Sequence, residues 1–354
     1  MNILKEIERR NHEQVVFCSD KRCGLQAIIA IHNTALGPAL GGTRMWTYAS
    51  DQDALVDALR LSRGMTYKAA VAGLNLGGGK AVIIGDPNKD KSESLFRTYG
   101  RFVEGLGGRY ITAEDVGTSV QDMELVRMET KYVTGIDRAL GGGGDPSPVT
   151  AVGVYHGIKA CLNELTGSDS LKGKQISVQG AGHVSSYLCE HLAKEGAKLF
   201  ITDIYEAKAR VLAEKCKGTY VEPEKIYDCP ADIFCPCALG AIINDETIPR
   251  LKAKIVAGGA NNQLADERKH GKMLAERGIL YAPDYAINAG GLINVEDELH
   301  GYDSERAHAK AAAIGARLRE VFARAKAEGV PPAAAADRIA GDRIRAAVAP
   351  PRSR

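Results

Sequence analysis

The sequence has no long apolar run and almost no net charge. No segment reaches the roughly 18 uninterrupted apolar residues of a membrane-spanning helix, and the formal net charge is +2 over 354 residues. Nothing in this balance requires a nucleic acid or an anionic membrane as partner. The first residues, MNILKEIERRNHEQ, are too charged for a secretory signal. We therefore expect a cytoplasmic protein that acts on a small molecule.

Cysteine is sparse and scattered. The eight cysteines are spread over a large chain with no export signal, which favours reduced thiols over a disulfide framework. The only local cluster is Cys229, Cys235 and Cys237, and its spacing matches no common zinc pattern. We therefore predict no metal site.

The length of the chain predicts two domains, because 354 residues exceed the size at which one hydrophobic core stops growing. The first part mixes strand-like runs such as LQAIIAIH (25–32) with helical periodicity such as DQDALVDALRLSRGM (51–65). It is an α/β domain, expected over residues 1–137, without a dinucleotide fingerprint. The stretch 135–150 is rich in glycine and proline and is interpreted as a connector.

The second part, expected over residues 138–329, alternates strands with helices. After a helix at 151–165 come a strand at 176–180, a helix at 183–196 and a strand at 198–203, which form a βαβ unit. Further strands are expected within 232–238, 254–260 and 279–284. This alternation is typical of a parallel, doubly wound sheet. The alanine-rich segment from about residue 305 is predicted to be helical.

The turn inside the βαβ unit has the composition of a dinucleotide-binding loop. Gly180, Gly182 and Ser185 occupy the three positions of G-x-G-x-x-G, and the third position needs only a small residue for the helix to pack on the strand. The helix N-terminus would hold a pyrophosphate through its free N–H groups and dipole. A glycine turn that binds no nucleotide is the alternative, and the strand–turn–helix context disfavours it.

Asp203 bears on the choice of cofactor. It lies at the end of the next strand, 23 residues after Gly180. An aspartate there accepts hydrogen bonds from both ribose hydroxyls and repels a 2′-phosphate, so NAD is favoured over NADP. Lys208 and Arg210 lie slightly beyond and keep NADP as an alternative. The predicted cofactor contacts of this turn are Gly180, Gly182, His183, Val184 and Asp203.

Three motifs in the first domain offer charged groups for chemistry. They are MTYK ending at Lys68, LGGGK ending at Lys80, and TAEDVGT containing Asp115. Three consecutive glycines weaken a strand or turn, so the triplet before Lys80 indicates that another group approaches the backbone closely. An NAD domain beside a second α/β domain suggests a dehydrogenase whose substrate binds in the cleft between them.

These motifs resemble the amino acid dehydrogenases that act on glutamate, leucine, phenylalanine and valine. The resemblance covers nearly the whole chain, through the segments 36–48, 57–70, 73–87, 108–118, 146–160, 236–245 and 281–295. The departures are small: His183 and Ser185 in the glycine turn, GGGGD before PSP, and Gly259. They affect details of cofactor affinity and not the class of reaction.

The resemblance implies roles for the three charged groups. Lys68 would bind the substrate carboxylate, Lys80 would be the acid/base group, and Asp115 would assist with the amino group and with proton transfer. Two ammonium groups in one secluded cleft disfavour each other's charge, so at least one lysine pKa should fall. Lys80 could then act as a base toward water. Gly41 and Gly42 would let the main chain approach the substrate on another wall.

The resemblance also places four apolar residues around the substrate side chain: Leu40, Ala113, Leu292 and Val295. Such a pocket cannot pair a second carboxylate, and burying one unpaired costs several kcal/mol, so glutamate is disfavoured. Leucine, isoleucine, valine and aromatic substrates are harder to separate, because a methylene is worth only about 1–3 kcal/mol. The remaining implied contacts are Asn262 for the substrate, and Thr150, Ala238, Gly240, Asn261 and Asn288 for the cofactor.

The implied function is reversible, NAD-dependent oxidative deamination of branched-chain L-amino acids. L-Leucine, water and NAD⁺ would give 4-methyl-2-oxopentanoate, ammonia and NADH. The alternatives are a preference for phenylalanine, valine or tryptophan on the same fold and, more remotely, a protein that binds NADH without catalysis. The resemblance further implies a first domain that binds substrate and forms a homo-oligomer, an octamer or a dimer, with a C-terminal helix at about 330–354 returning to it.

Overall fold

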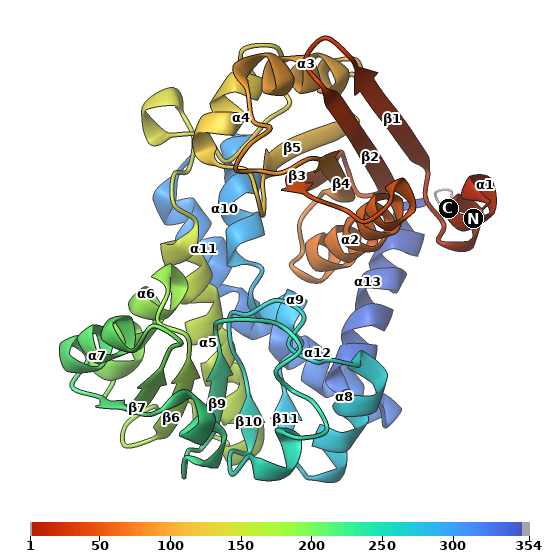
Figure 1. Cartoon of the computed structure of the whole chain (residues 1–354). Helices are drawn as coiled ribbons and strands as arrows, with labels where there is room; N and C mark the ends of the chain where they lie inside the picture. The colour runs from red at the N-terminus through yellow and green to blue at the C-terminus, as the bar shows by residue number, and fades with distance from the viewer. Residues whose placement is uncertain (1, 349–354) are drawn as a thin grey trace. The chain divides into compact units, whose positions relative to one another are not determined.

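The structure, a computed structural model, describes residues 2–348 and divides into two compact units (Figure 1). The first unit contains the chain up to Asp145, the segment Val295–Asp303 and the chain from Ala340 onward. The second contains Pro146–Asn294 and Ser304–Ile339. The expected C-terminal helix is α13, Pro332–Val348, and only its second half belongs to the first unit. Residues 349–354 of that expected helix lie outside the described residues.

Two sets of hydrogen bonds explain why the first unit includes distant parts of the chain. Glu298, at the end of α10 (Gly290–Glu298), accepts the N–H groups of Gly135 and Gly143, both at 2.9 Å. Arg343 of α13 donates to the carbonyl of Leu74 at 2.6 Å and to that of Ala70 at 3.1 Å. The first unit therefore runs past the expected boundary at residue 137.

The first unit is built on a mixed five-stranded sheet. Its strands are β1 (Gln14–Asp20), β2 (Leu25–Asn33), β3 (Ala39–Trp46), β4 (Gly77–Ile84) and β5 (Tyr110–Glu114), in the order β1-β2-β4-β3-β5. The strands β3, β4 and β5 are mutually parallel, whereas β2 pairs antiparallel with β1 and β4. Parallel strands end at one edge of a sheet, so β3, β4 and β5 deliver their carboxyl ends to one place.

Helices cover both faces of this sheet, and α1 (Ile3–Arg9) precedes it. Helix α2 (Asp51–Val71) packs its apolar side on one face, where the buried residues are Ile28, Ala30, Val82, Ala54, Leu55, Ala58 and Leu59. Helices α3 (Glu93–Glu104) and α4 (Val120–Arg127) cover the other face. The sheet contributes Ala27, Ile29 and Ile83 to the core on that side. Side chains alternate along a strand, so each strand supplies both layers.

The glycine triplet lies within β4 and is closely surrounded. A Cβ at Gly78 would lie 2.1 Å from the backbone nitrogen of Thr66 in α2. A Cβ at Gly77 would lie 2.0 Å from the carbonyl oxygen of Asn33, and one at Gly79 would lie 2.5 Å from the ring of Tyr110. The groups that press on this strand are therefore α2, the neighbouring strand β2 and a tyrosine of β5.

The second unit is built on a parallel sheet, as predicted, and this sheet has six strands, of which β8 was not predicted. Its strands are β6 (Gln175–Gln179), β7 (Lys198–Thr202), β8 (Thr219–Tyr220), β9 (Ile233–Pro236), β10 (Ile255–Val256) and β11 (Leu280–Tyr281). Their order is β11-β10-β9-β6-β7-β8, the order of dinucleotide-binding sheets. The strands follow the chain outward from β6 on one side and from β9 on the other, so the switch point lies between β6 and β9. Ligands of such sheets bind beyond the carboxyl ends of the strands at that point.

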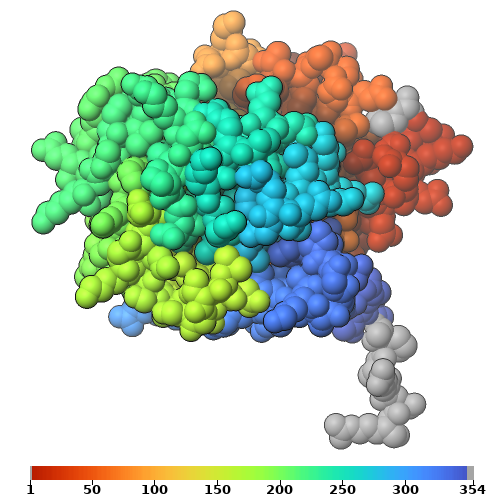
Figure 2. Space-filling model, turned by 90° about the horizontal axis from the view of Figure 1, so that it is seen from below, coloured from red at the N-terminus to blue at the C-terminus, as the bar shows by residue number. Residues whose placement is uncertain are grey.

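Helices surround this sheet. The helices are α5 (Ser147–Thr166), α6 (His183–Lys194), α7 (Glu206–Lys215), α8 (Glu267–Glu276), α9 (Asp284–Ile287), α11 (Ser304–Ala312) and α12 (Ile314–Glu328). Short 3₁₀ turns span Arg138–Leu140, Pro223–Asp228 and Ile248–Arg250. Helix α12 packs along α5, and Figure 2 shows the blue C-terminal helices next to the yellow-green segment that contains the end of α5. Within residues 2–348, every helix is too short or too polar to span a bilayer.

The connector is shorter than expected from the sequence. Helix α5 begins at Ser147, so residues 147–150 are helical, with Pro146 at the N-cap position. The helix begins earlier in the sequence than expected, because proline has no N–H to leave unpaired and its φ suits a first turn.

The tight packing of β4 generates a stability prediction. Gly78→Ala should lower the thermal midpoint, because the new Cβ meets backbone atoms of α2. The free energy of unfolding should fall by at least the ~1–3 kcal/mol typical of an overpacked core. Gly271→Ala in α8 is the matched control, since its Cβ meets only Leu264 Cδ1 at 3.8 Å and alanine favours a helix by up to ~1 kcal/mol. Equal midpoints for the two variants would contradict the packing argument.

Candidate active site

Three parallel strands bring the predicted catalytic residues of the first unit together. Lys80 lies in β4, and Asp115 directly follows β5. Between these strands lies β3, which pairs with both and carries Arg44. Lys80 is buried, with 5% of its surface exposed, and Asp115 Oδ2 accepts its Nζ at 3.0 Å. The structure thus places the predicted acid/base lysine and its carboxylate in direct contact.

A tight turn holds Asp115 in place. The hydroxyl of Thr118 accepts the N–H of Asp115 at 2.9 Å and donates to the carbonyl of Thr43 at 2.8 Å. Gly117 has φ +82, and a Cβ there would lie 2.0 Å from the carbonyl oxygen of Met45. Only glycine accommodates both the left-handed backbone and this close approach, so the DVGT sequence sets the position of the aspartate.

Arg44 is a site residue that the sequence analysis did not single out. Its Nε donates to Asp115 Oδ2 at 2.9 Å, the same oxygen that Lys80 contacts. Its Nη1 donates to Asp57 Oδ2 at 2.9 Å, and Tyr48 donates to that oxygen at 2.8 Å. The available signal was its position in LGGTRMW, because alternate residues of a strand share a face and Arg44 follows Leu40 and Gly42 at that spacing.

The charges in this cluster alter the pKa values of its members. Burial lowers the pKa of Lys80, and the attraction of Asp115 only partly offsets that effect. Burial raises the pKa of Asp115, but the charges of Lys80 and Arg44 outweigh it, so the pKa falls below its ordinary value. The lowered lysine pKa has the predicted direction but a different cause. Burial dominates, and the repelling cation is Arg44 rather than a second lysine.

The substrate residues predicted in the first unit lie on the same strands or next to them. Leu40 and Ala113 are 2% and 5% exposed. Gly42 pairs with Ala113, and a Cβ at Gly41 would lie 1.7 Å from the carbonyl oxygen of Gly79. Lys68 lies in the last turn of α2, two residues after Thr66, which touches Gly78. The end of α2 that carries Lys68 therefore packs on β4.

The glycine turn of the second unit has the geometry that a pyrophosphate requires. Gly180 has φ +111, and a Cβ there would lie 3.0 Å from Ala238. Gly182 is the N-cap of α6, no side chain caps that helix, and a Cβ at Gly182 would meet nothing within 4 Å. The first N–H groups of α6 have no side-chain cap, which fits an anionic group. His183 and Val184 begin the helix, and Ser185, its third residue, is fully buried.

Asp203 has a structural contact in addition to its predicted role. Its Oδ2 accepts the N–H of Ala181 in the glycine turn at 2.7 Å, and its Oδ1 accepts the N–H of Tyr205 at 2.8 Å. The aspartate therefore ties the end of β7 to the turn. Each carboxylate oxygen has lone pairs for a further donor, so the carboxylate fits a ribose.

The other predicted cofactor residues gather at the carboxyl ends of β9 and β10. Asn288 Nδ2 donates to Asn261 Oδ1 at 2.7 Å. A Cβ at Gly240 would lie 2.8 Å from the carbonyl oxygens of Asn261 and Asn262. Asn262 has φ +50, a conformation that asparagine tolerates better than most residues. Ala238 lies against Gly180, so this cluster adjoins the glycine turn.

Thr150, Leu292 and Val295 complete the predicted set. Thr150 lies in the first turn of α5, where a Cβ at Gly290 would lie 2.6 Å from its Cα. Leu292 and Val295 both belong to α10, which begins in the second unit and ends in the first. The two residues therefore fall in different units, although they are three positions apart on one helix.

Two further features are separate from these residues. Cys235 and Cys237 have Sγ atoms 3.6 Å apart, and within residues 2–348 no group of three or more His, Cys, Asp or Glu is arranged to hold a metal.

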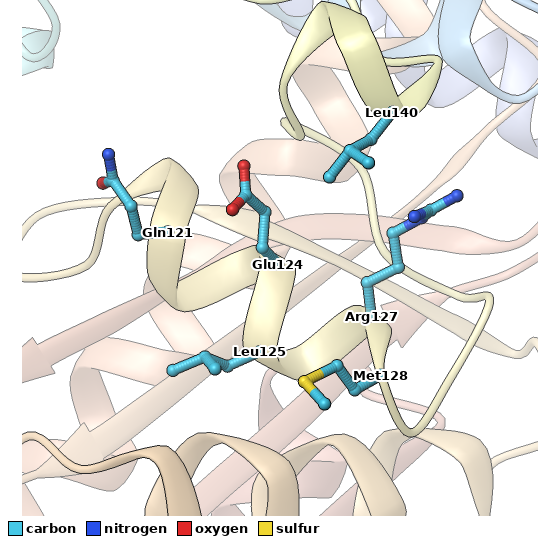
Figure 3. A pocket seen from close by; sticks show the side chains of 6 residues that line it. All are labelled: Gln121, Glu124, Leu125, Arg127, Met128 and Leu140. Carbon is cyan, nitrogen blue, oxygen red and sulfur yellow. The ribbon is translucent and has the colours of Figure 1, made fainter.

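A cavity of about 470 Å³ lies beside α4 (Figure 3), lined by Gln121, Glu124, Leu125, Arg127, Met128 and Leu140. It contains none of the predicted site residues.

A sheet of dinucleotide-binding order with an uncapped glycine turn, in one chain with a buried lysine–carboxylate pair, defines a dehydrogenase. Residues 12–132 match the dimerisation domain of Glu/Leu/Phe/Val dehydrogenases, and residues 141–204 and 199–347 match the glutamate/leucine/phenylalanine/valine dehydrogenase domain. The chain belongs to the Glu/Leu/Phe/Val dehydrogenase family of amino acid dehydrogenases.

Individual relatives are similar over almost the full length. A leucine dehydrogenase of Thermoactinomyces intermedius is 61% identical over 97% of this chain and 94% of its own. One of Geobacillus stearothermophilus is 59% identical over the same shares. Among solved structures, an L-tryptophan dehydrogenase from Nostoc punctiforme has a TM-score of 0.88 and 48% identity, covering 98% of this chain and 99% of its own.

The charge cluster predicts how stability depends on pH. Asp115 has a lowered pKa in the folded state, so its contribution is present above its unfolded value near 3.8 and is lost as pH falls through the folded value. Asp115→Asn should lower the unfolding free energy at pH 7 by about 1.5–3 kcal/mol, typical of hydrogen bonds to charged groups. In urea unfolding, the difference from the wild type should shrink below about pH 4. A difference independent of pH would contradict this account.

Proposed function

We propose that this chain catalyses the reversible, NAD-dependent oxidative deamination of L-leucine and related branched-chain L-amino acids. L-Leucine, water and NAD⁺ would give 4-methyl-2-oxopentanoate, ammonium, NADH and a proton. The observation that carries the proposal is the buried Lys80 amine, with its lowered pKa, in contact with Asp115. The two leucine dehydrogenases, at 61% and 59% identity, support the choice of substrate.

The chemistry required of the protein is proton transfer at the substrate amino group. NAD, held by the residues of the glycine turn, would supply the acceptor for the hydride that leaves the α-carbon of the substrate. An unprotonated Lys80 then takes a proton from the water that attacks the resulting iminium carbon, and as an ammonium group it returns that proton to the departing amine. Asp115 orients the amino group and balances the positive charge that Lys80 gains. Both roles need the two side chains in contact, as they are here.

NAD is the cofactor that the second unit fits best. The uncapped start of α6, with Gly180, Gly182, His183 and Val184, suits the pyrophosphate. Asp203, which accepts the Ala181 N–H, would place a negative charge near the position of the 2′-phosphate of NADP. The remaining residues proposed to line the same site are Thr150, Ala238, Gly240, Asn261 and Asn288.

The proposed pocket for the substrate side chain is apolar. Leu40 and Ala113 come from adjacent strands and are buried, and we propose that Leu292 and Val295 complete the pocket. Lys68 would pair with the substrate carboxylate, beside the main chain of Gly41 and Gly42, with Asn262 as a further contact. A second carboxylate would find no partner among the four apolar side chains.

We also propose an oligomeric state and a cellular compartment for the enzyme. The match to a dimerisation domain over residues 12–132 supports a homo-oligomer, a dimer or an octamer. The eight cysteines are all free thiols, which favours a reducing compartment, so we place the enzyme in the cytoplasm.

A substrate panel tests this function. With NAD at alkaline pH, NADH formation should give a higher kcat/KM for leucine, isoleucine and valine than for phenylalanine or tryptophan. Glutamate should be slower still, by about 100-fold or more, because its carboxylate would be buried unpaired. NADP should support slower turnover than NAD. Preference for an aromatic substrate would favour the specificity of the Nostoc relative, and absence of NADH formation with every amino acid would reject the function.

Lys80→Ala tests the proposed acid/base group. Loss of a general base typically costs about 10²–10⁴-fold in kcat. NADH binding, measured by fluorescence titration, should be unchanged because the glycine turn is untouched. Lys89→Ala is the matched control, because Lys89 is also paired with an aspartate but is 79% exposed. Full activity in the Lys80 variant would exclude the assigned role.

A further inference from the structure

Arg44 connects the proposed acid/base pair to the rest of the first unit. Its Nε donates to Asp115 Oδ2 at 2.9 Å, and its Nη1 donates to Asp57 Oδ2 at 2.9 Å. The side chain is only 23% exposed. Because a guanidinium is planar and its donors are fixed in direction, these two bonds determine where it lies.

The partner of Arg44 in α2 is itself held on both oxygens. Tyr48 donates to Asp57 Oδ2 at 2.8 Å, and Arg60 Nη2 donates to Asp57 Oδ1 at 3.1 Å. Asp57 thus has little freedom to turn, and neither does Arg44. The rigid chain ends at Asp115 Oδ2, the oxygen that faces Lys80 Nζ at 3.0 Å.

The charge of Arg44 acts on both members of the pair. An arginine stays protonated at every working pH. Its cation stabilises the ionised form of Asp115 and opposes the ammonium form of Lys80. Burial is the largest influence on each pKa: it lowers that of Lys80, and it raises that of Asp115, which falls below its ordinary value only because Lys80 and Arg44 outweigh burial. Other charged or titratable groups that interact with this pair are Tyr48 and Asp57, which come from α2 and the segment before it, and Tyr110 and Glu114 of β5.

We propose that Arg44 is a positioning residue of the deamination reaction. It keeps the Asp115 carboxylate ionised and turned toward Lys80, and its positive charge disfavours the ammonium form of Lys80. The proposal rests on the proposed function, and it assigns to Arg44 a task beyond tying β3 to α2.

A purely structural role has a matched comparison within the same unit. Arg97 of α3 also bridges two carboxylates, through Nε to Glu129 at 2.7 Å and through Nη1 to Glu93 at 3.1 Å. In the part of the chain that the structure describes, neither Glu129 nor Glu93 forms an ion pair with a lysine. An arginine that only links elements should therefore behave like Arg97 when it is replaced.

The test is the pH profile of kcat/KM for leucine in the wild type, Arg44→Gln and Arg97→Gln. Without the Arg44 charge the pKa of Lys80 should rise. The limb of the profile on which activity increases with pH should therefore move to higher pH. A shift of about one pH unit corresponds to a 10-fold loss below the limb, recovered at higher pH. Arg97→Gln should leave the limb in place. Arg44→Lys, which retains the charge, should restore the limb while kcat stays reduced.

Two outcomes would overturn the proposal. One is an Arg44→Gln profile with the wild-type limb, and the other is a loss of activity that is equal at every pH. If Arg44→Gln does not fold, Asp57→Asn decides. Removing that carboxylate leaves the Arg44 charge less neutralised, so the limb must move to lower pH, and an unmoved limb rejects the idea.

A measurement without turnover separates this proposal from the proposed function. Reductive methylation of Lys80 by formaldehyde, followed by mass spectrometry of the peptide, reports the fraction of unprotonated amine at each pH. The midpoint should be about one unit higher in Arg44→Gln than in the wild type. If the wild type oxidises no amino acid yet the midpoint shifts, the function fails while the charge effect of Arg44 stands. If leucine is oxidised but the midpoint is unchanged, the proposal fails alone.

Discussion

One carboxylate oxygen serves two cations in the first unit. Asp115 Oδ2 accepts hydrogen bonds from both Lys80 and Arg44, and Arg44 is also paired with Asp57. Arginine does not release its proton, whereas a lysine ammonium does when burial and a nearby cation disfavour it. Because Lys80 is the most deeply buried of these groups, desolvation lowers its pKa. An amine that gives up its proton more readily thus arises where a buried lysine shares one carboxylate oxygen with an arginine.

The backbone of the sheet makes that arrangement possible. Three parallel strands bring Arg44, Lys80 and Asp115 together, and the glycines of β3 and β4 let strands and α2 approach more closely than any side chain would allow. On the opposite face, Tyr110 donates to the carbonyl of Gly41 at 2.6 Å, which supports the strand behind the site. The supports of the site are backbone and hydroxyl groups of the strands and of the turn that follows β5.

The second unit uses a different device for a different purpose. Its glycine turn is held from below by Asp203 and by the close contact of Gly180 with Ala238, and the first N–H groups of α6 remain open. Beside it, Asn288, the C-cap of α9, donates to Asn261, which follows β10. Membership of the Glu/Leu/Phe/Val dehydrogenase family accounts for both units in one chain.

Much of this protein was determined by local sequence. The alternation of strands and helices predicted the parallel sheet, and the spacing of Gly180, Gly182 and Ser185 predicted the turn, because periodicity and turn chemistry act over short distances. Resemblance to a family supplied Lys80 and Asp115. Only the tertiary structure revealed the place of Arg44, whose carboxylate partner lies 71 positions away, and the contact of Glu298 with Gly135, 163 positions away. Such pairs depend on strand register and helix packing, and these are decided by burial across the whole fold rather than by any local pattern.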